Sequence, residues 1–123
     1  MTNQDIMMRL ELLKQLGSVR GKLGWYIYRN TKILADACAE AVKLRNDAVV
    51  KYGTKDGEDT YSINRSSEKW QEYIAEVEPV LKIEQEVKML KLGREEFEHL
   101  AEASGLSAAE LTIIDELIVE DSE

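Results

Sequence analysis

Apolar residues recur at helical spacing through a long central stretch of the chain. Residues 22–52 contain no proline and, after Gly24, no glycine, and charged residues separate the apolar ones. A helix over this stretch would be about 45 Å long at ~1.5 Å per residue, more than the width of a compact domain of 123 residues. Other elements must therefore lie along it. Its predicted apolar face consists of Leu23, Ile27, Leu34, Ala37, Ala41, Leu44 and Ala48.

The first 17 residues predict a short amphipathic helix. Asn3 is the expected N-cap, and Gly17 with Ser18 is the expected end. This helix can cover part of the long one. Its apolar face consists of Ile6, Met7, Leu10, Leu13 and Leu16.

A third set of apolar residues at helical spacing predicts a helix over residues 67–83, with its N-cap within residues 64–67. Pro79 should kink or end this helix, because proline lacks an amide donor and clashes with the preceding turn. The helix is the expected antiparallel partner of the long one. Its stripe steps by four, three and four residues through Trp70, Ile74, Val77 and Leu81.

Two segments predict extended structure. Residues 49–63 (VVKYGTKDGEDTYSI) predict a β-hairpin with its turn near Gly53 to Asp59. Residues 80–92 fit both a helix and an alternating strand. We expect helix to about Ile83 and an extended piece from about Val87 to Leu92.

Residues 94–119 predict a pair of short helices. Phe97, Leu100 and Ala101 form one apolar face, and Ser107 with Glu110 forms a capping box for the second helix. The apolar face of that second helix consists of Leu111, Ile114, Leu117 and Ile118.

The predicted fold is mainly α: a long antiparallel helical hairpin with a small β-hairpin at its tip and a C-terminal pair of short helices. Residues 1–123 would form a single domain, with an N-terminal helix at 1–17, the hairpin at 22–83 and the helix pair at 94–119. The hairpin is expected to enclose one core made of Ile27, Leu34, Ala41, Ile74, Val77 and Leu81.

The net charge of −8 is unevenly distributed along the chain. Residues 94–123 hold ten acidic residues and one basic residue, a net charge of −9, whereas residues 1–93 sum to +1. Residues 121–123 are read as an acidic tail. Residues 9–32 are locally basic, with six Lys and Arg residues against one Glu. Such polarity favours docking within a chain or between chains, and the alternative is two separately solvated faces.

The chain offers few residues for catalysis or metal binding. Its only cysteine, Cys38, lies in a row of small residues at 35–41 and is expected in the core, because no base is evident to activate it. Its only histidine, His99, lies among glutamates, but one helix alone rarely encloses a metal ion. The acidic turn at 56–59 lacks EF-hand spacing. We therefore expect a protein that is not an enzyme and has no cofactor.

Two sequence patterns suggest nucleic-acid binding. Trp25, Tyr26 and Tyr28 are interleaved with basic residues, as in surfaces that stack bases, but the net acidity favours packing of these rings against the N-terminal helix. Residues 101–111 have the spacing of a helix-turn-helix, but the helix that would read DNA contains acidic residues and no Lys or Arg. Binding to duplex DNA is therefore not expected.

The order of four segments resembles that of small proteins of unknown function from tailed bacteriophages and prophages of Gram-positive bacteria. The similarity covers about residues 10–119. It implies a phage origin and a helical hairpin with a β-turned tip, and it implies no activity. The segments are KLGWYIYRNTKIL, KYGTKDGEDTYSI, EKWQEYIAEVEPVLKIEQEV and LSAAELTIIDELI.

Taken together, these patterns predict a non-enzymatic phage accessory protein in the host cytoplasm that acts by binding a protein. It would be an assembly factor or an inhibitor of a host defence protein. The alternative is an acidic decoy that mimics nucleic acid and blocks a host DNA- or RNA-binding protein. The absence of catalytic motifs disfavours an enzyme.

The expected interaction surface is polar, and no membrane partner is expected because no apolar run approaches ~20 residues. Self-association, most simply as a homodimer, is expected through the small residues at 35–41 or through charge pairing. The surface residues are Arg20, Lys22, Arg29, Lys32, Lys55, Asp56, Glu58, Asp59, Glu110, Asp115 and Glu116.

Overall fold

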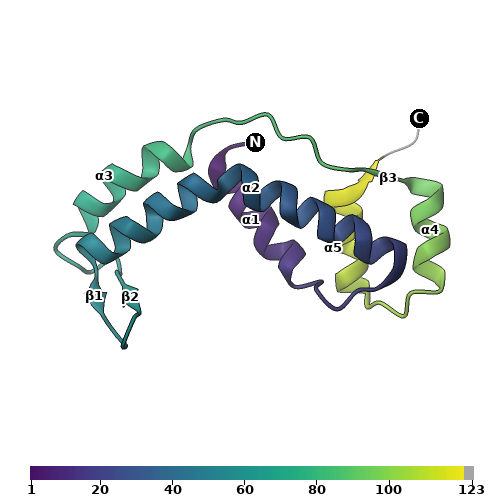
Figure 1. Ribbon diagram of the computed structural model, residues 1–123, viewed down its shortest axis with the longest axis horizontal. Coiled ribbons are helices and arrows are strands. Elements are labelled where there is room, and N and C mark those ends of the chain that lie inside the picture. Colours follow the sequence, from purple (N-terminus) through teal and green to yellow (C-terminus); the bar gives the residue numbers. More distant parts are fainter. Residues whose placement is uncertain (121–123) are drawn as a thin grey trace.

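The prediction of a mainly helical fold is confirmed. A computed structural model describes residues 1–120, in which the chain forms five helices and four two-residue strands (Figure 1). The predicted acidic tail at 121–123 lies outside the described residues. In chain order the elements are α1 (Asn3–Lys14), α2 (Gly21–Tyr52), β1 (Thr54–Lys55), β2 (Tyr61–Ser62), α3 (Trp70–Leu81), β3 (Leu92–Gly93), α4 (Arg94–Glu102), α5 (Ala108–Ile118) and β4 (Val119–Glu120).

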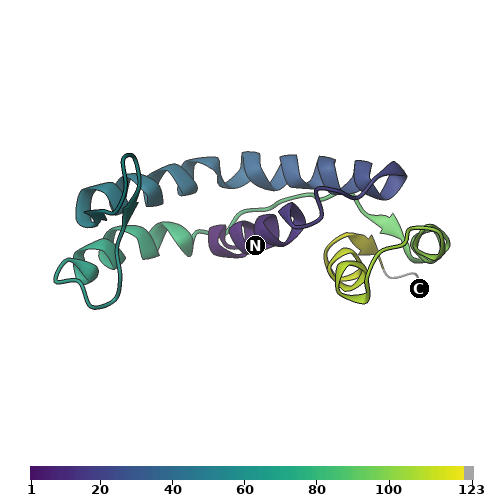
Figure 2. The ribbon, with the colours of Figure 1, turned by 90° about the horizontal axis from the view of Figure 1, so that it is seen from below.

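Helix α2 is the spine of an elongated molecule. Figure 2 shows α3 running back beneath its C-terminal half and α1 beneath its middle, with α4 and α5 near its N-terminal end. Helices α1 and α3 have 12 residues each, against 32 in α2. Neither can cover the long helix alone, so its apolar face is divided among three sets of partners.

The core is divided in the same way. Ile27 and Leu34 belong to a large cluster that joins α1, the first half of α2, β3, α4 and α5. Val77 belongs to a smaller cluster with Ala48 and Tyr73 near the tip. The predicted single core is therefore wrong. The reason is that α1 occupies the part of the α2 face that a longer α3 would have covered.

The helix ends differ from the predicted ones. Thr2, not Asn3, caps α1, because its hydroxyl accepts a hydrogen bond from Asp5 N at 3.1 Å in a complete capping box. Asn3 is buried, and its Nδ2 donates to Val80 O at 2.8 Å. Pro79 lies within the last turn of α3, which ends at Leu81 rather than near Ile83. The capping box of Ser107 and Glu110 at α5 is confirmed.

An extended segment, residues 83–91, connects α3 to α4 along α2 and is called the strap below. Two side-chain amides hold it. Asn30 is fully buried in α2, its Nδ2 donates to Leu90 O at 2.9 Å, and its Oδ1 accepts from Leu90 N at 2.7 Å. Gln85 Nε2 donates to Ala37 O at 2.8 Å and to Asn3 Oδ1. The strap thus gains hydrogen bonds at both ends without belonging to a sheet.

The strap anchors the N-terminus at one end and, at the other end, the C-terminal module, which consists of β3, α4, α5 and β4. Met1 and Gln85 exchange two backbone hydrogen bonds, of 3.0 and 2.7 Å, at one end. At the other end β3 pairs in parallel with β4, with Leu92 opposite Val119. Gly105 adopts a positive φ of 69° between α4 and α5, a conformation that glycine adopts at little cost. These contacts fold the helix pair back against the start of α2.

We expect Asn30→Ala to lower the free energy of unfolding by about 1–3 kcal/mol, because the N–H and C=O of Leu90 would lose their partners in a largely buried site. The measurement is urea denaturation followed by circular dichroism. Hydrogen exchange at the Leu90 amide should also become faster.

The matched control is Asn46→Ala, which removes the same side chain from an exposed position of the same helix. It should change the free energy of unfolding by no more than about 0.5 kcal/mol. Equal losses for the two variants would contradict the role given to Asn30.

Cys38 is 1% exposed within the large cluster, as expected for a core residue. Burial raises the pKa of its thiol. The reactive thiolate is therefore scarce at neutral pH. We expect iodoacetamide at pH 8 to modify native protein far more slowly than protein unfolded in urea, as measured by mass spectrometry. A Ser66→Cys variant, at an exposed position, supplies the accessible control, and equal rates at the two cysteines would refute the burial of Cys38.

Candidate binding surfaces

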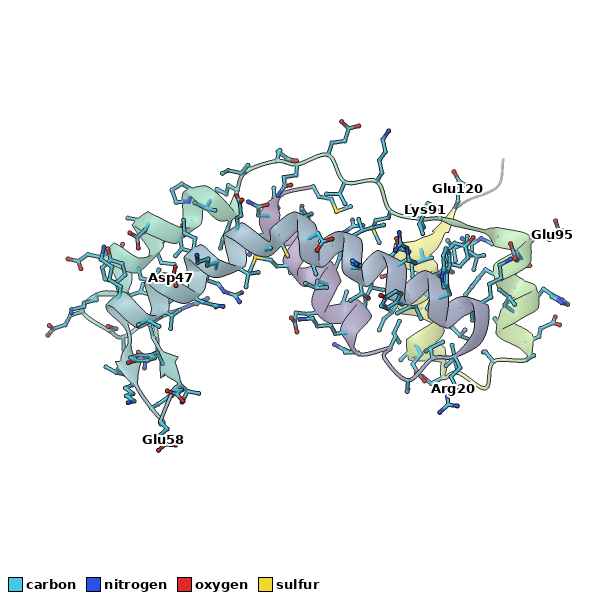
Figure 3. The ribbon with its side chains drawn as sticks, viewed as in Figure 1. Arg20, Asp47, Glu58, Lys91, Glu95 and Glu120 are labelled. Carbon is cyan, nitrogen blue, oxygen red and sulfur yellow. The ribbon has the colours of Figure 1, made fainter. Side chains whose placement is uncertain are left out.

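The structure places the predicted surface residues in three separate regions. Arg20, Lys22, Arg29 and Lys32 lie at the N-terminal end of α2, and residues 55–59 lie in the β-hairpin at the opposite end of that helix. Figure 3 shows this separation through Arg20 and Glu58. Glu110, Asp115 and Glu116 lie on α5. These residues therefore do not form one continuous surface.

Three of the predicted residues make contacts that support the C-terminal module. Lys22 pairs with Glu96 of α4, and the hydrogen bond to this carboxylate raises the pKa of Lys22. Asp115 Oδ1 lies 2.8 Å from Arg94 Nη1. Glu110 Oε1 accepts from Ser107 N at 3.1 Å in the cap of α5. Part of the predicted attraction between basic and acidic segments is thus satisfied within the chain.

The β-hairpin at the tip is held by local hydrogen bonds. Strands β1 and β2 pair antiparallel, and Asp56 N donates to Thr60 O at 3.0 Å across the turn. The hydroxyls of Ser62 and then Thr60 lower the pKa of Asp56, so its carboxylate stays charged. Within residues 1–120 no group of three or more His, Cys, Asp or Glu residues is arranged to hold a metal ion. Residues 54–62 are all exposed, so the turn is a polar loop in solvent.

A groove of about 650 Å³ lies between the end of α2, β2 and the start of α3. We call it the tip groove. Val50 and Tyr61 line it and are 51% and 38% exposed. Arg45 and Asp59 give it one charge of each sign. Its other apolar lining comes from Val49, Ile63, Trp70 and Tyr73.

The tip groove is not among the surfaces predicted from the sequence. Val49 and Val50 are predicted to lie in a strand, whereas both belong to the last turn of α2. Adjacent residues of a helix point about 100° apart, so Val49 packs partly against the small cluster while the side chain of Val50 is left exposed. Two adjacent apolar residues at the end of a helix are the sequence signal that could have indicated the tip groove.

A second surface lies on the outer side of α2 near its start. Trp25 and Tyr28 are 54% and 61% exposed, so their predicted packing against the N-terminal helix is wrong. Leu23 and Ile27 already fill the inner face, and of the three neighbouring rings only Tyr26 packs against the large cluster. We define the aromatic–basic patch as Trp25, Tyr28, Arg29 and Lys32, all of which are exposed.

A third surface is a groove of about 540 Å³ between α4 and α5, called the α4–α5 groove. Phe97, Ala101 and Leu111 form its apolar floor. Glu98, Glu102 and Asp115 form an acidic rim. The groove is lined by the two helices that flank the helix-turn-helix spacing of the sequence, and its acidic rim repels a nucleic-acid backbone.

The row of small residues at 35–41 is partly used within the chain. Cys38 and Ala41 are buried, and Ala37 accepts the hydrogen bond from the strap. Ala35 and Ala39 border a groove of about 650 Å³ between α1 and α2. Self-association through this row stays a prediction. Among the helices of residues 1–120, none has the length and apolar character needed to cross a bilayer.

Comparison of the chain with known protein families, with curated proteins and with solved structures finds no match. The phage origin implied by the resemblance of the four sequence segments therefore stays a prediction. The grooves, the exposed rings and the distribution of charge are the observations on which a function can be proposed.

Proposed function

We propose that this protein binds another protein through the tip groove and performs no catalysis. The observation that carries the proposal is the exposure of Val50 and Tyr61 in the lining of a groove that combines apolar and aromatic side chains with polar ones. Apolar side chains that are gathered in a concave site and framed by polar residues mark a binding site more often than scattered apolar ones do.

The backbone around the tip groove favours a preformed site. A Cβ at Gly53 would overlap the backbone oxygens of Val49 and Ser62, so the glycine lets the hairpin leave α2 at close range. Tyr73 and Val77 pack on Ala48 beneath the groove and fix α3 against α2. In this proposal α2 and α3 act as an antiparallel hairpin that presents the tip away from the C-terminal module (Figure 2). A rigid site loses little conformational entropy when a partner binds.

The resemblance to phage proteins supports a more specific role. We place the protein in the cytoplasm of a bacterial host, as an accessory protein that assists assembly or inhibits a host defence protein. Its partner would insert an apolar side chain between Val50 and Tyr61. Arg45 and Asp59 would select polar groups around that side chain.

A second candidate function is an acidic decoy for a nucleic-acid-binding protein. The observation that favours it is the rim of the α4–α5 groove, within a segment of net charge −9. A decoy would bind through charge, and its affinity would fall steeply with salt. Binding through the tip groove depends on apolar contact and would respond weakly to salt.

We expect Val50→Lys to abolish capture of the partner when the tagged protein is used as bait in lysate from infected host cells. A charged ammonium would replace the apolar side chain, and the loss of a central contact is expected to weaken binding at least about tenfold. Quantitative mass spectrometry of the captured proteins is the measurement.

Asp47→Lys is the matched control, because it adds the same side chain three residues earlier, outside the tip groove (Figure 3). A partner that is kept by the control and lost by Val50→Lys supports the proposal. A partner kept by both variants but released by moderate salt would reject the tip groove and favour the decoy.

A further inference from the structure

We infer that the aromatic–basic patch of one molecule docks into the α4–α5 groove of a second copy of this chain. This inference concerns surfaces other than the tip groove and does not depend on the proposed function. It gives the expected self-association a specific pair of contacting surfaces.

The patch has the composition of an anchor at a protein interface. Trp25 and Tyr28 are three residues apart on α2 and therefore neighbours on its surface. They are among the most exposed large apolar side chains of the described residues. Arg29 and Lys32 extend the same outer face. Tryptophan, tyrosine and arginine are the residues most enriched at the energetic centres of interfaces.

The α4–α5 groove is complementary to the patch in both polarity and charge. Its floor of Phe97, Ala101 and Leu111 offers an apolar bed for two aromatic rings. Its rim offers Glu98 and Glu102 as partners for the two cations beside the rings. A volume of about 540 Å³ is within the ~300–1,000 Å³ range of small-molecule binding sites and is therefore large enough for aromatic side chains.

Asp115 of the groove rim pairs with Arg94 within the chain, but the four charges on which the contact depends are not neutralised in this way. In the described part of the molecule, Arg29, Lys32, Glu98 and Glu102 form no ion pair, whereas the neighbouring Lys22 and Glu96 pair with each other. No ion pair of residues 1–120 joins the patch to the groove of its own molecule. The complementary halves are therefore free to meet between molecules.

A second copy is the occupant that the charges favour. Each copy carries one patch and one groove, so two copies related by a two-fold axis can make both contacts at once. A nucleic acid would meet the acidic α4 beside the patch and be repelled by it. Two closed contacts of this kind bury four aromatic rings in all.

The test is a charge exchange followed by sedimentation at about 0.15 M salt, where the Debye length of ~8 Å screens the net charge of each molecule but not close contacts. One variant reverses the patch (Arg29→Glu with Lys32→Glu), and a second reverses the groove (Glu98→Lys with Glu102→Lys). The wild type should associate to twice its mass of 14.0 kDa. Each variant alone should associate at least about a hundredfold more weakly, because like charges would meet.

The mixture of the two variants should recover association, because each reversed surface then meets its opposite on the other chain. Recovery also shows that both variants are folded. The controls reverse two exposed charges elsewhere and match the net charge of each variant: Lys43→Glu with Lys69→Glu, and Glu40→Lys with Glu72→Lys. Both controls should associate like the wild type.

Trp25→Ala supplies a second measurement, because it should weaken association without changing the net charge. A wild-type monomer at all concentrations would overturn the inference. So would association that survives reversal of the patch, or a mixture that stays monomeric. Larger assemblies that require both surfaces would support the same contact in an open, head-to-tail arrangement.

Discussion

The arrangement of the whole chain depends on how the strap satisfies its backbone. Residues 83–91 carry polar N–H and C=O groups along α2 without a helix or a sheet of their own. Asn30 solves this problem at one end by offering Leu90 the donor and acceptor that a neighbouring strand would offer. At the other end Met1 exchanges two backbone hydrogen bonds with Gln85, and Asn3 N donates to Ile83 O at 3.0 Å. The side chain of Gln85 then attaches the strap to α2 through Ala37 O. An apolar residue at position 30 would fill the stripe but leave the strap unsupported.

The position of the strap determines where the acidic end of the chain lies. It carries the chain from the end of α3 back toward the start of α2, where Lys22 meets Glu96 and β3 meets β4. The basic and acidic segments of the sequence are therefore only partly available to other molecules, because the pair of Lys22 and Glu96 joins them within the chain. What is left exposed is the rim of the α4–α5 groove and the outer face of α2. The course of the strap thus decides which charges pair within the chain and which remain available to partners.

The elements that sequence reasoning predicted well are those fixed by local chemistry. The capping box at Ser107 and Glu110 and the periodicity of residues 22–52 involve neighbours within two turns, so their outcome does not depend on the rest of the fold. Asn30 lies in the same buried stripe, but its polarity excluded it from the predicted face, because its partner is 60 residues away. The division of the core between α1 and α3 is not predictable locally either, because two helices far apart in sequence compete for the apolar face of α2.

Competition between helices also makes the candidate surfaces harder to predict from the sequence than the fold. A residue such as Trp25 is apolar whether it is packed or exposed, and only the occupation of the inner face by Leu23 and Ile27 decides between the two. Val50 is exposed for a related reason, since Ala48 and Val49 already face the small cluster at the tip. In both places the long helix has more apolar side chains than its partners can cover. Because the two places lie near opposite ends of α2, they can serve different partners at once, and occupation of one leaves the other accessible.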